Sequence, residues 1–133
     1  MKSLIGKTIT EIAVSLGKEF IRLAIQDEPE PVYFYTFADC CSESWIEHMS
    51  LPTLPAVVES IKESTPVNGC ATRQEYDQIY LVEVMCKAKY TTRWTIEFRN
   101  SSNGYYGGAL YKCNEFGIKR ATEQTFAVIT EDF

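Results

Sequence analysis

The stretch that decides the fold is Ile79-Tyr80-Leu81-Val82-Glu83-Val84-Met85-Cys86-Lys87-Ala88-Lys89-Tyr90-Thr91-Thr92-Arg93-Trp94-Thr95-Ile96-Glu97-Phe98-Arg99. Residues 79–88 and 93–99 both alternate between apolar and polar positions, which is the period of a half-buried β-strand. In the second half, Trp94, Ile96 and Phe98 point to one face of the strand. Residues 89–92 lie between the two halves as a hairpin connection. The stretch therefore predicts an antiparallel hairpin with one buried face.

The first third of the chain predicts a β-meander. Strand patterns cover residues 7–15, 20–26 and 32–37, and the second is the clearest of the three. In that strand Ile21, Leu23 and Ile25 face one way, and the residues between them face the other. Residues 27–31 contain two prolines and are expected to form a loop.

The middle of the chain predicts one or two short helices after the third strand. In residues 41–49, Trp45, Ile46 and Met49 are able to share one helical face. Thr53 is expected to cap a second helix that runs to about residue 63, with Pro55 near its first turn. The apolar side chains of this helix that should point inward are Val57, Val58 and Ile61.

The last part of the chain returns to strands, at residues 105–112 and 125–130. Gly117 and the Lys119-Arg120 pair are expected to lie in the connection between them. The whole pattern predicts a single α+β domain over residues 1–133. Its core is a mostly antiparallel β-sheet of about six strands, with one or two short helices inserted after the third strand.

Composition excludes several classes of function. The chain has 133 residues, is 45% hydrophobic and 23% charged, and carries a net charge of −5, which is typical of an acidic globular protein. Direct nucleic-acid binding is not expected, because it requires clustered Lys and Arg. The apolar runs are too short for a membrane span and no signal peptide is apparent. Five cysteines form an odd count, which favours reduced thiols and a cytoplasmic location.

The segment from Asp39 to His48 gathers reactive side chains. On a helix, Asp39, Glu43 and Glu47 would form an acidic stripe at i, i+4 and i+8, beside Trp45. Like charges at this spacing repel unless a cation neutralises them, so the stripe favours a partner with a basic surface or a divalent ion. The alternative is a solvated helix face with no ligand.

The same segment contains two adjacent thiols and the one histidine of the chain, His48. A zinc site is not expected, because Cys40 and Cys41 point in different directions and no C-x-x-C pair or second histidine completes a tetrahedron. Thiol catalysis would require His48 as the base. We therefore expect no metal, no cofactor and no enzymatic activity.

A glycine-rich turn follows the hairpin, at residues 101–108. Asn103-Gly104 is a strong turn signal, and Tyr105 and Tyr106 come directly after it on opposite faces of the next strand. The turn is expected to be a structural hairpin or bulge. The alternative is a recognition surface whose tyrosines stack on a flat ligand or fill a pocket of a partner protein.

Both of these segments resemble an uncharacterised family of small proteins found in bacteriophages and mobile elements. That family carries a Cys-Cys-Glu-Ser-Val-x-Ile-Glu-Asp-type motif and a Ser-Asn-Gly-Tyr-Tyr-Ser motif. The chain matches the first at Cys40-Cys41 and Ile46-Glu47, and the second at residues 102–106. It departs from the motifs at Ser42, His48 and Gly107. The resemblance implies a phage-type setting and a shared fold, but no activity.

From these observations we expect a small acidic binding protein that inhibits a host protein. The resemblance makes a defence effector, such as a CRISPR or restriction protein, the specific form of this hypothesis. The alternative is a small-molecule binder that sequesters a nucleotide-like signal, with Asn103, Tyr105 and Tyr106 lining its pocket. An exposed terminal strand also makes a homodimer the default assembly.

Overall fold

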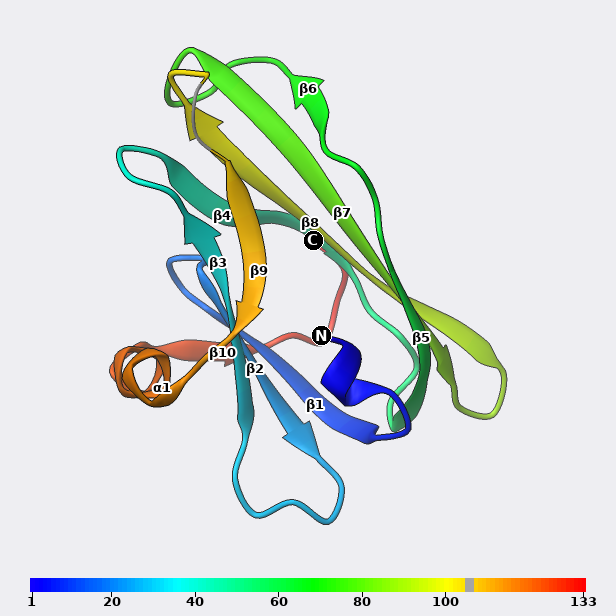
Figure 1. Cartoon of the computed structure of the whole chain (residues 1–133). Coiled ribbons are helices and arrows are strands. Elements are labelled where there is room, and N and C mark those ends of the chain that lie inside the picture. Colours follow the sequence, from blue (N-terminus) through cyan, green and yellow to red (C-terminus); the bar gives the residue numbers. More distant parts are fainter. Residues whose placement is uncertain (105–106) are drawn as a thin grey trace.

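The computed structural model describes residues 1–104 and 107–133, and most of these belong to one antiparallel β-sheet (Figure 1). The described part of the chain contains a short 3-10 helix η1, one α-helix α1 and ten strands. Their bounds are η1 Lys2–Leu4, β1 Thr8–Ser15, β2 Phe20–Ile25, β3 Val32–Ala38, β4 Glu43–Ser50, β5 Ala56–Glu63, β6 Val67–Gly69, β7 Tyr76–Lys87, β8 Thr91–Ser102, β9 Gly108–Lys112, α1 Glu115–Thr122 and β10 Phe126–Val128.

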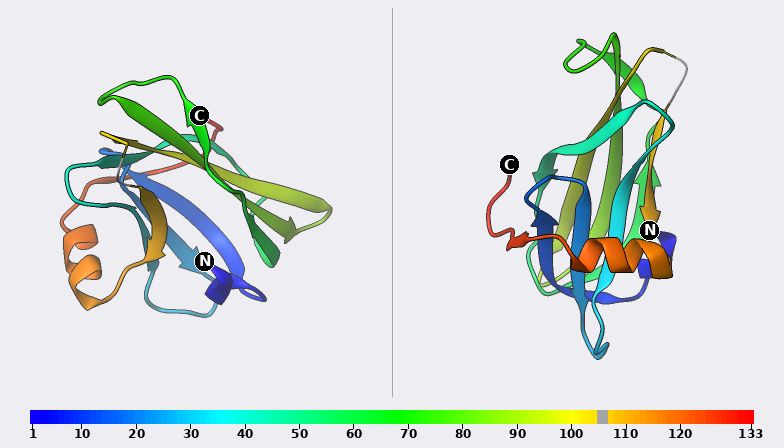
Figure 2. Two further views of the ribbon diagram at one scale, coloured as in Figure 1. Left: turned by 45° about the horizontal axis from the view of Figure 1, so that its top comes forward. Right: turned by 90° about the vertical axis from the view of Figure 1, so that its left-hand side faces the viewer.

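The strand order in the sheet is β4-β8-β7-β5-β1-β2-β3-β9, with β6 paired to β7 and β10 paired to β1. The sheet coils over on itself, so that β4, β8 and β7 lie across the core from β1, β2, β3 and β9 (Figures 1 and 2). The apolar side chains of both layers meet in a single main cluster. Its largest fully buried members are Trp94, Phe34, Leu4, Ile9, Ile12, Ile21, Leu23, Ile46, Met49 and Ile96.

Segments beyond the strand ladders hold β4 in place. Met49 and Phe133 exchange backbone hydrogen bonds of 2.9 and 3.0 Å, so the C-terminal segment pairs with β4. On the same edge of β4, the one away from β8, the Thr36 hydroxyl donates to the Ser44 carbonyl at 3.2 Å and links β3 to β4. β4 is therefore held by β8 on one edge and by these contacts on the other.

The strands predicted in the first third and in the last half of the sequence are confirmed, and those expected at residues 105–112 and 125–130 correspond to β9 and β10 within the described residues. The expected hairpin is β7–β8, which extends further than predicted and pairs from Tyr76 with Ser102 to Lys87 with Thr91. Trp94, Ile96 and Phe98 are all buried. The meander is β1-β2-β3, in which neighbouring strands pair antiparallel.

The predicted α+β class with about six strands is wrong, because both helices expected in the middle of the chain are strands. Residues 43–50 form β4, which pairs with β8, and residues 56–63 form β5, which pairs with β7. Thr53 therefore caps no helix, and Pro55 lies just before β5 rather than in a first helical turn. The molecule is mostly antiparallel β-sheet with a single α-helix among the described residues.

β-Bulges account for this error. The register of β4 shifts between Ile46 and His48, and that of β5 shifts between Val58 and Ser60. An extra residue at a bulge returns side chains three positions apart to the same face of a strand. Ile46 and Met49 thus both enter the core at a spacing that imitates a helix. Val58 and Ile61 do the same on β5.

The α-helix lies where the sequence had suggested only a connection. Asn114 caps α1, and its Oδ1 accepts a hydrogen bond of 2.9 Å from the Gly117 N–H. Ala121 anchors the helix on the outer face of the sheet, in a second cluster with Phe20 and Tyr33 (Figure 2). Within the described residues, no helix is long and apolar enough to span a membrane.

The assignment of β5 as a strand predicts that substitutions at two adjacent valines differ in their cost to stability. Val58 is 1% exposed, whereas Val57 is 38% exposed. We expect Val58→Ala to lower the free energy of unfolding by roughly 2–3 kcal/mol through cavity formation. The matched variant Val57→Ala should cost less than about 1 kcal/mol, because little buried area is lost. Urea denaturation measures both, and equal losses would contradict the assignment of this segment as a strand.

Candidate functional site

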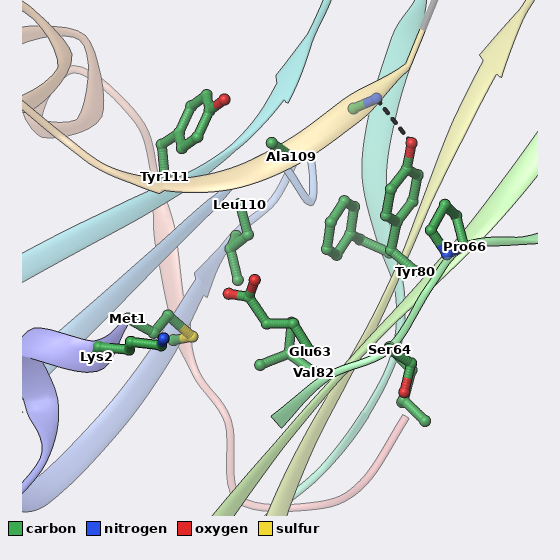
Figure 3. A pocket seen from close by; sticks show the side chains of 13 residues that line it. Met1, Lys2, Glu63, Ser64, Pro66, Tyr80, Val82, Ala109, Leu110 and Tyr111 are labelled. Carbon is green, nitrogen blue, oxygen red and sulfur yellow. Dashed lines mark hydrogen bonds between the residues drawn. The ribbon is translucent and has the colours of Figure 1, made fainter. Parts of the chain in front are cut away.

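A cleft opens between β9, the β5–β7 side of the sheet and η1 (Figure 3). Its volume is about 520 Å³, and we call it the β9 cleft. Tyr80, Phe98 and Leu110 line its apolar part, and the exposed side chains of Lys2 and Glu63 bring charge to its rim. This volume lies within the range of protein sites that take small ligands or side chains of a partner.

Two stacked aromatic rings form one wall of the β9 cleft. Tyr80 and Phe98 are cross-strand neighbours on β7 and β8, and their rings lie 4.7 Å apart at an interplanar angle of 5°. The Tyr80 hydroxyl donates to Gln78 Oε1 at 2.9 Å and accepts from the Gly108 N–H at 3.1 Å (Figure 3). Tyr80 therefore bridges β7 to β9 and fixes one end of the cleft.

The hydrogen-bonding direction of β9 follows from its two flanking contacts with β3. The Cys113 N–H donates to the Tyr33 carbonyl at 2.9 Å, and the Asp39 N–H donates to the Gly107 carbonyl at 3.2 Å. Hydrogen-bonded pairs alternate with non-hydrogen-bonded pairs along an antiparallel ladder. The odd-numbered residues of this segment therefore direct their backbone groups toward β3.

The even-numbered residues of β9 direct their backbone groups away from β3. The bond from the Gly108 N–H to Tyr80 follows this rule. By the same alternation, the N–H and C=O groups of Leu110 and Lys112 point to the outer edge of the strand, along the β9 cleft. β9 is also the last strand in the sheet order, so the cleft runs beside an edge strand.

A second cluster lies on the outer side of β4 and contains three of the predicted contact residues. The Arg73 guanidinium lies 3.9 Å from the centre of the Trp45 ring. It also pairs with Glu43 at 3.8 Å, while the Trp45 indole N–H donates to Glu47 Oε2 at 2.6 Å. The sequence interpretation missed Arg73, which supplies within the chain the cation that was expected from a partner.

The acidic stripe itself is wrong, because it required a helix. On a strand, residues four apart lie about 13 Å apart, so Glu43 and Glu47 do not form a continuous charged row. Asp39 is separate from both, in the turn between β3 and β4. Glu43 and Glu47 are instead connected through the cluster around Trp45 and Arg73.

A buried carboxylate holds the loop that carries Arg73. The side chain of Asp77 is 0% exposed and accepts hydrogen bonds from the hydroxyls of Thr72 and Ser101, each at 2.6 Å. Arg99 Nη1 lies 3.2 Å from Asp77 Oδ2. Burial alone would raise the pKa of Asp77, but the hydrogen bonds from Ser101, Thr72 and Arg99 outweigh it, and the pKa is lowered.

The same loop connects the carboxylate to the β3–β4 turn. The backbone N–H of Gln74 donates to Ser101 Oγ at 2.8 Å, and its side-chain amide donates to the Cys41 carbonyl at 2.8 Å. Arg73 precedes Gln74 and lies on Trp45. One loop thus fixes both the cluster on β4 and the turn that carries the adjacent cysteines.

The segment from Asp39 to His48 and the turn after β8 lie side by side. Besides the bond between Asp39 and Gly107, the Asn100 amide donates to Ser42 Oγ at 3.0 Å and to Ser44 Oγ at 2.9 Å. The turn between β3 and β4 is therefore tied to the end of β8. The structure brings together at one end of the sheet two segments that lie about sixty residues apart in the sequence.

The turn after β8 is described only in part. Asn103 and Gly104 are exposed, and Gly104 has a φ of 102°, a conformation that favours glycine. Its N–H donates to Ser102 Oγ at 3.0 Å. Tyr105 and Tyr106, which were predicted to be contact residues, lie outside the described residues.

The histidine and the adjacent cysteines are far apart. His48 is near the end of β4 and lies 3.7 Å from Glu97, whereas Cys41 comes before the start of the strand. Seven residues of extended chain separate Cys41 from His48 by roughly 20 Å. Among the described residues, no three His, Cys, Asp or Glu side chains are grouped so that they could hold a metal ion.

Comparison with known proteins identifies a family. A family model described as "Domain of unknown function (DUF7448)" matches residues 2–112. The chain belongs to this family. The matched region runs from η1 to the end of β9, so it includes every residue that lines the β9 cleft except Met1, whereas α1 and β10 follow it. No curated protein and no solved structure matches the chain.

Family membership confirms the expectation of an uncharacterised family and leaves the phage setting as a prediction.

The sequence did not identify the residues of the β9 cleft, for a physical reason. Tyr80 and Phe98 were recognised as strand residues, but their pairing depends on the register of the hairpin, which the pattern did not fix. One signal in the sequence could have indicated the buried Asp77, since it is a charged residue at the start of an apolar strand.

The buried carboxylate makes stability depend on pH. We expect Asp77→Asn to lower the free energy of unfolding by about 3 kcal/mol at pH 7, because it removes the charge that Arg99 faces. The native pKa is below the unfolded value of about 3.9, so this stabilisation is present above pH 4 and is lost as the pH falls through the native pKa.

Urea denaturation of the wild type and the variant at pH 7 and at pH 3 tests this prediction. The difference between the two proteins should shrink at the lower pH. Glu30→Gln, at an exposed loop position, is the matched control and should match the wild type at pH 7. A loss in Asp77→Asn that is equal at both pH values would contradict the charged network.

Proposed function

We propose that this protein is a non-catalytic binding protein that captures an extended segment of a partner protein in the β9 cleft. The observation that carries the proposal is the open edge of β9. The backbone groups of Leu110 and Lys112 point along that edge, beside an apolar cavity of about 520 Å³. An added strand would gain backbone hydrogen bonds from the edge and specificity from side chains that enter the cavity.

The shape and chemistry of the β9 cleft support an extended peptide. Successive side chains of a strand point to opposite faces, so every second side chain of the segment would enter the cleft. The first of these would lie against Tyr80 and Phe98, whose stacked rings offer a flat apolar surface. Apolar or aromatic side chains are therefore expected at the inward positions of the partner segment.

The wider hypothesis is that the captured segment belongs to a host protein that this protein inhibits. The net charge of −5 favours a partner with a basic surface, because opposite charges accelerate encounter. The resemblance to phage and mobile-element proteins supports a host defence effector, such as a CRISPR or restriction protein, as that partner. In this setting the protein would act by occupying a host surface, without catalysis.

A pair of substitutions at Lys112 tests strand addition. Linear peptides are selected from a random display library against the purified protein, and their dissociation constants are measured by fluorescence polarisation. Lys112→Pro removes a backbone N–H on the outer edge of β9, whereas Lys112→Ala keeps it and removes the same charge. We expect the proline variant to bind at least about fivefold more weakly than the alanine variant, the equivalent of one net hydrogen bond.

Two outcomes would contradict strand addition at β9. One is equal affinity of the two variants when circular dichroism shows that both retain the fold. The other is a library that yields no peptide binder for the wild-type protein.

The second candidate function is the binding of a flat small molecule, such as a nucleotide-like signal. The stacked wall of Tyr80 and Phe98 and the nearby Lys2 favour it, because one offers a ring surface and the other a positive charge. Asn103, which was expected to line the ligand pocket, is exposed on the turn after β8 and does not line the β9 cleft.

A thermal-shift screen against cyclic and linear nucleotides tests this candidate. A ligand at a hundred times its dissociation constant should stabilise the fold by about 2.7 kcal/mol and raise the melting temperature by several degrees. The shift should disappear in Tyr80→Leu and persist in Tyr76→Leu, where an exposed tyrosine on the same strand is lost. A flat response across the panel would exclude nucleotides as ligands.

A further inference from the structure

The turn between β3 and β4 presents two thiols next to each other. Cys40 and Cys41 are both exposed, and their Sγ atoms lie 3.1 Å apart. We propose that these two cysteines form a dithiol site that captures a trivalent thiophilic metalloid, with arsenic(III) as the representative ligand. This site is separate from the β9 cleft and does not depend on the proposed peptide-binding function.

The turn holds the two thiols on the same side. Ser42 closes it, because both its N–H and its hydroxyl donate to the Asp39 carbonyl, at 2.9 and 2.7 Å. Cys41 has a φ of 65°, which is uncommon for a residue other than glycine, and Gln74 holds its carbonyl at 2.8 Å. Adjacent side chains that would diverge in a strand are thus brought together.

The geometry favours a bridging atom over a disulfide. The Cα atoms of adjacent residues are about 3.8 Å apart, whereas those of disulfide-linked cysteines are usually about 4.4–6.8 Å apart. A disulfide would also require the sulfur separation to contract from 3.1 Å to about 2.05 Å. An atom bound to both sulfurs allows them to remain apart and avoids this strain.

The binding step needs no oxidant. With an arylarsenoxide, R–As=O, both thiol protons leave with the oxygen atom as water, two As–S bonds form, the bond between arsenic and oxygen breaks and arsenic stays trivalent. The hydrogen bond with Cys41, and then the charge of Cys41, raise the pKa of Cys40.

The other cysteines of the chain differ from this pair. Cys86 and Cys113 are buried, and burial raises the pKa of both thiols, that of Cys86 to about 11. Cys70 is exposed and lies between β6 and β7, and among the described residues it does not form a group with Cys40 and Cys41 that could hold a metal ion. Cys70 therefore serves as the matched single-thiol control.

Intact-mass spectrometry with phenylarsine oxide tests the proposal on the full chain. The reduced wild-type protein should add one molecule of phenylarsine oxide with loss of one water molecule, and should keep the adduct in the presence of excess 2-mercaptoethanol. 1,2-Ethanedithiol should remove it. Cys40→Ser and Cys41→Ser should each weaken retention by about 100-fold or more, because the second sulfur binds at a high effective concentration. Cys70→Ser should behave as the wild type.

Three outcomes would overturn the proposal. The first is equal retention of the arsenical by Cys40→Ser or Cys41→Ser and the wild type. The second is loss of the adduct in Cys70→Ser. The third is a wild-type protein that holds a disulfide between Cys40 and Cys41 under excess 2-mercaptoethanol and so takes up no arsenical.

Discussion

The register of the β7–β8 hairpin is the constraint on which the rest of the structure depends. It pairs Tyr80 with Phe98, which creates the aromatic wall of the β9 cleft. It also pairs Asp77 with Ser101, so that a hydroxyl directly opposite helps to satisfy the buried carboxylate. A slip of one residue would exchange the faces of a strand and would destroy both features at once. Burial of Trp94 and Ile96 on the core face of β8 opposes such a slip.

The sequence was sufficient to predict the strands whose pattern is regular. The alternation of apolar and polar residues was sufficient to find β2, β7 and β8. β1 and β3 were found from their β-branched and aromatic residues, and β1 contains a register shift between Ile9 and Glu11. The error arose in β4 and β5, where a bulge places inward side chains three residues apart, as in Ile46 and Met49. A local pattern does not separate a bulged strand from a short helix, because the extra residue is defined only by the neighbouring strand.

In the candidate site too, features that depend on local sequence were predicted, whereas features that depend on contacts between distant segments were not. The reactive segment from Asp39 to His48 and the turn after β8 were both recognised, since each is unusual in its own composition. Arg73 was not, because its role comes from a loop that returns from β6 to Trp45 on β4. The β9 cleft was missed for the same reason: its walls come from strands that meet only after the sheet has coiled. The sequence pattern also failed to predict α1. Gly117 suggested a connection, although it lies inside a helix that Asn114 caps.

An open edge strand is a hazard in a soluble protein, because it offers unpaired backbone groups to any other chain. Natural proteins protect such edges with charges, prolines, bulges or covering segments. In β9 the protection is partial: Tyr80 holds the Gly108 N–H, and Lys112 places a charge at the other end. Between them the edge is recessed in a cleft whose opposite rim carries Glu63. A recess of this kind hinders pairing with the edge of another folded sheet, yet it leaves room for a single extended chain, and this difference favours selective capture over general aggregation.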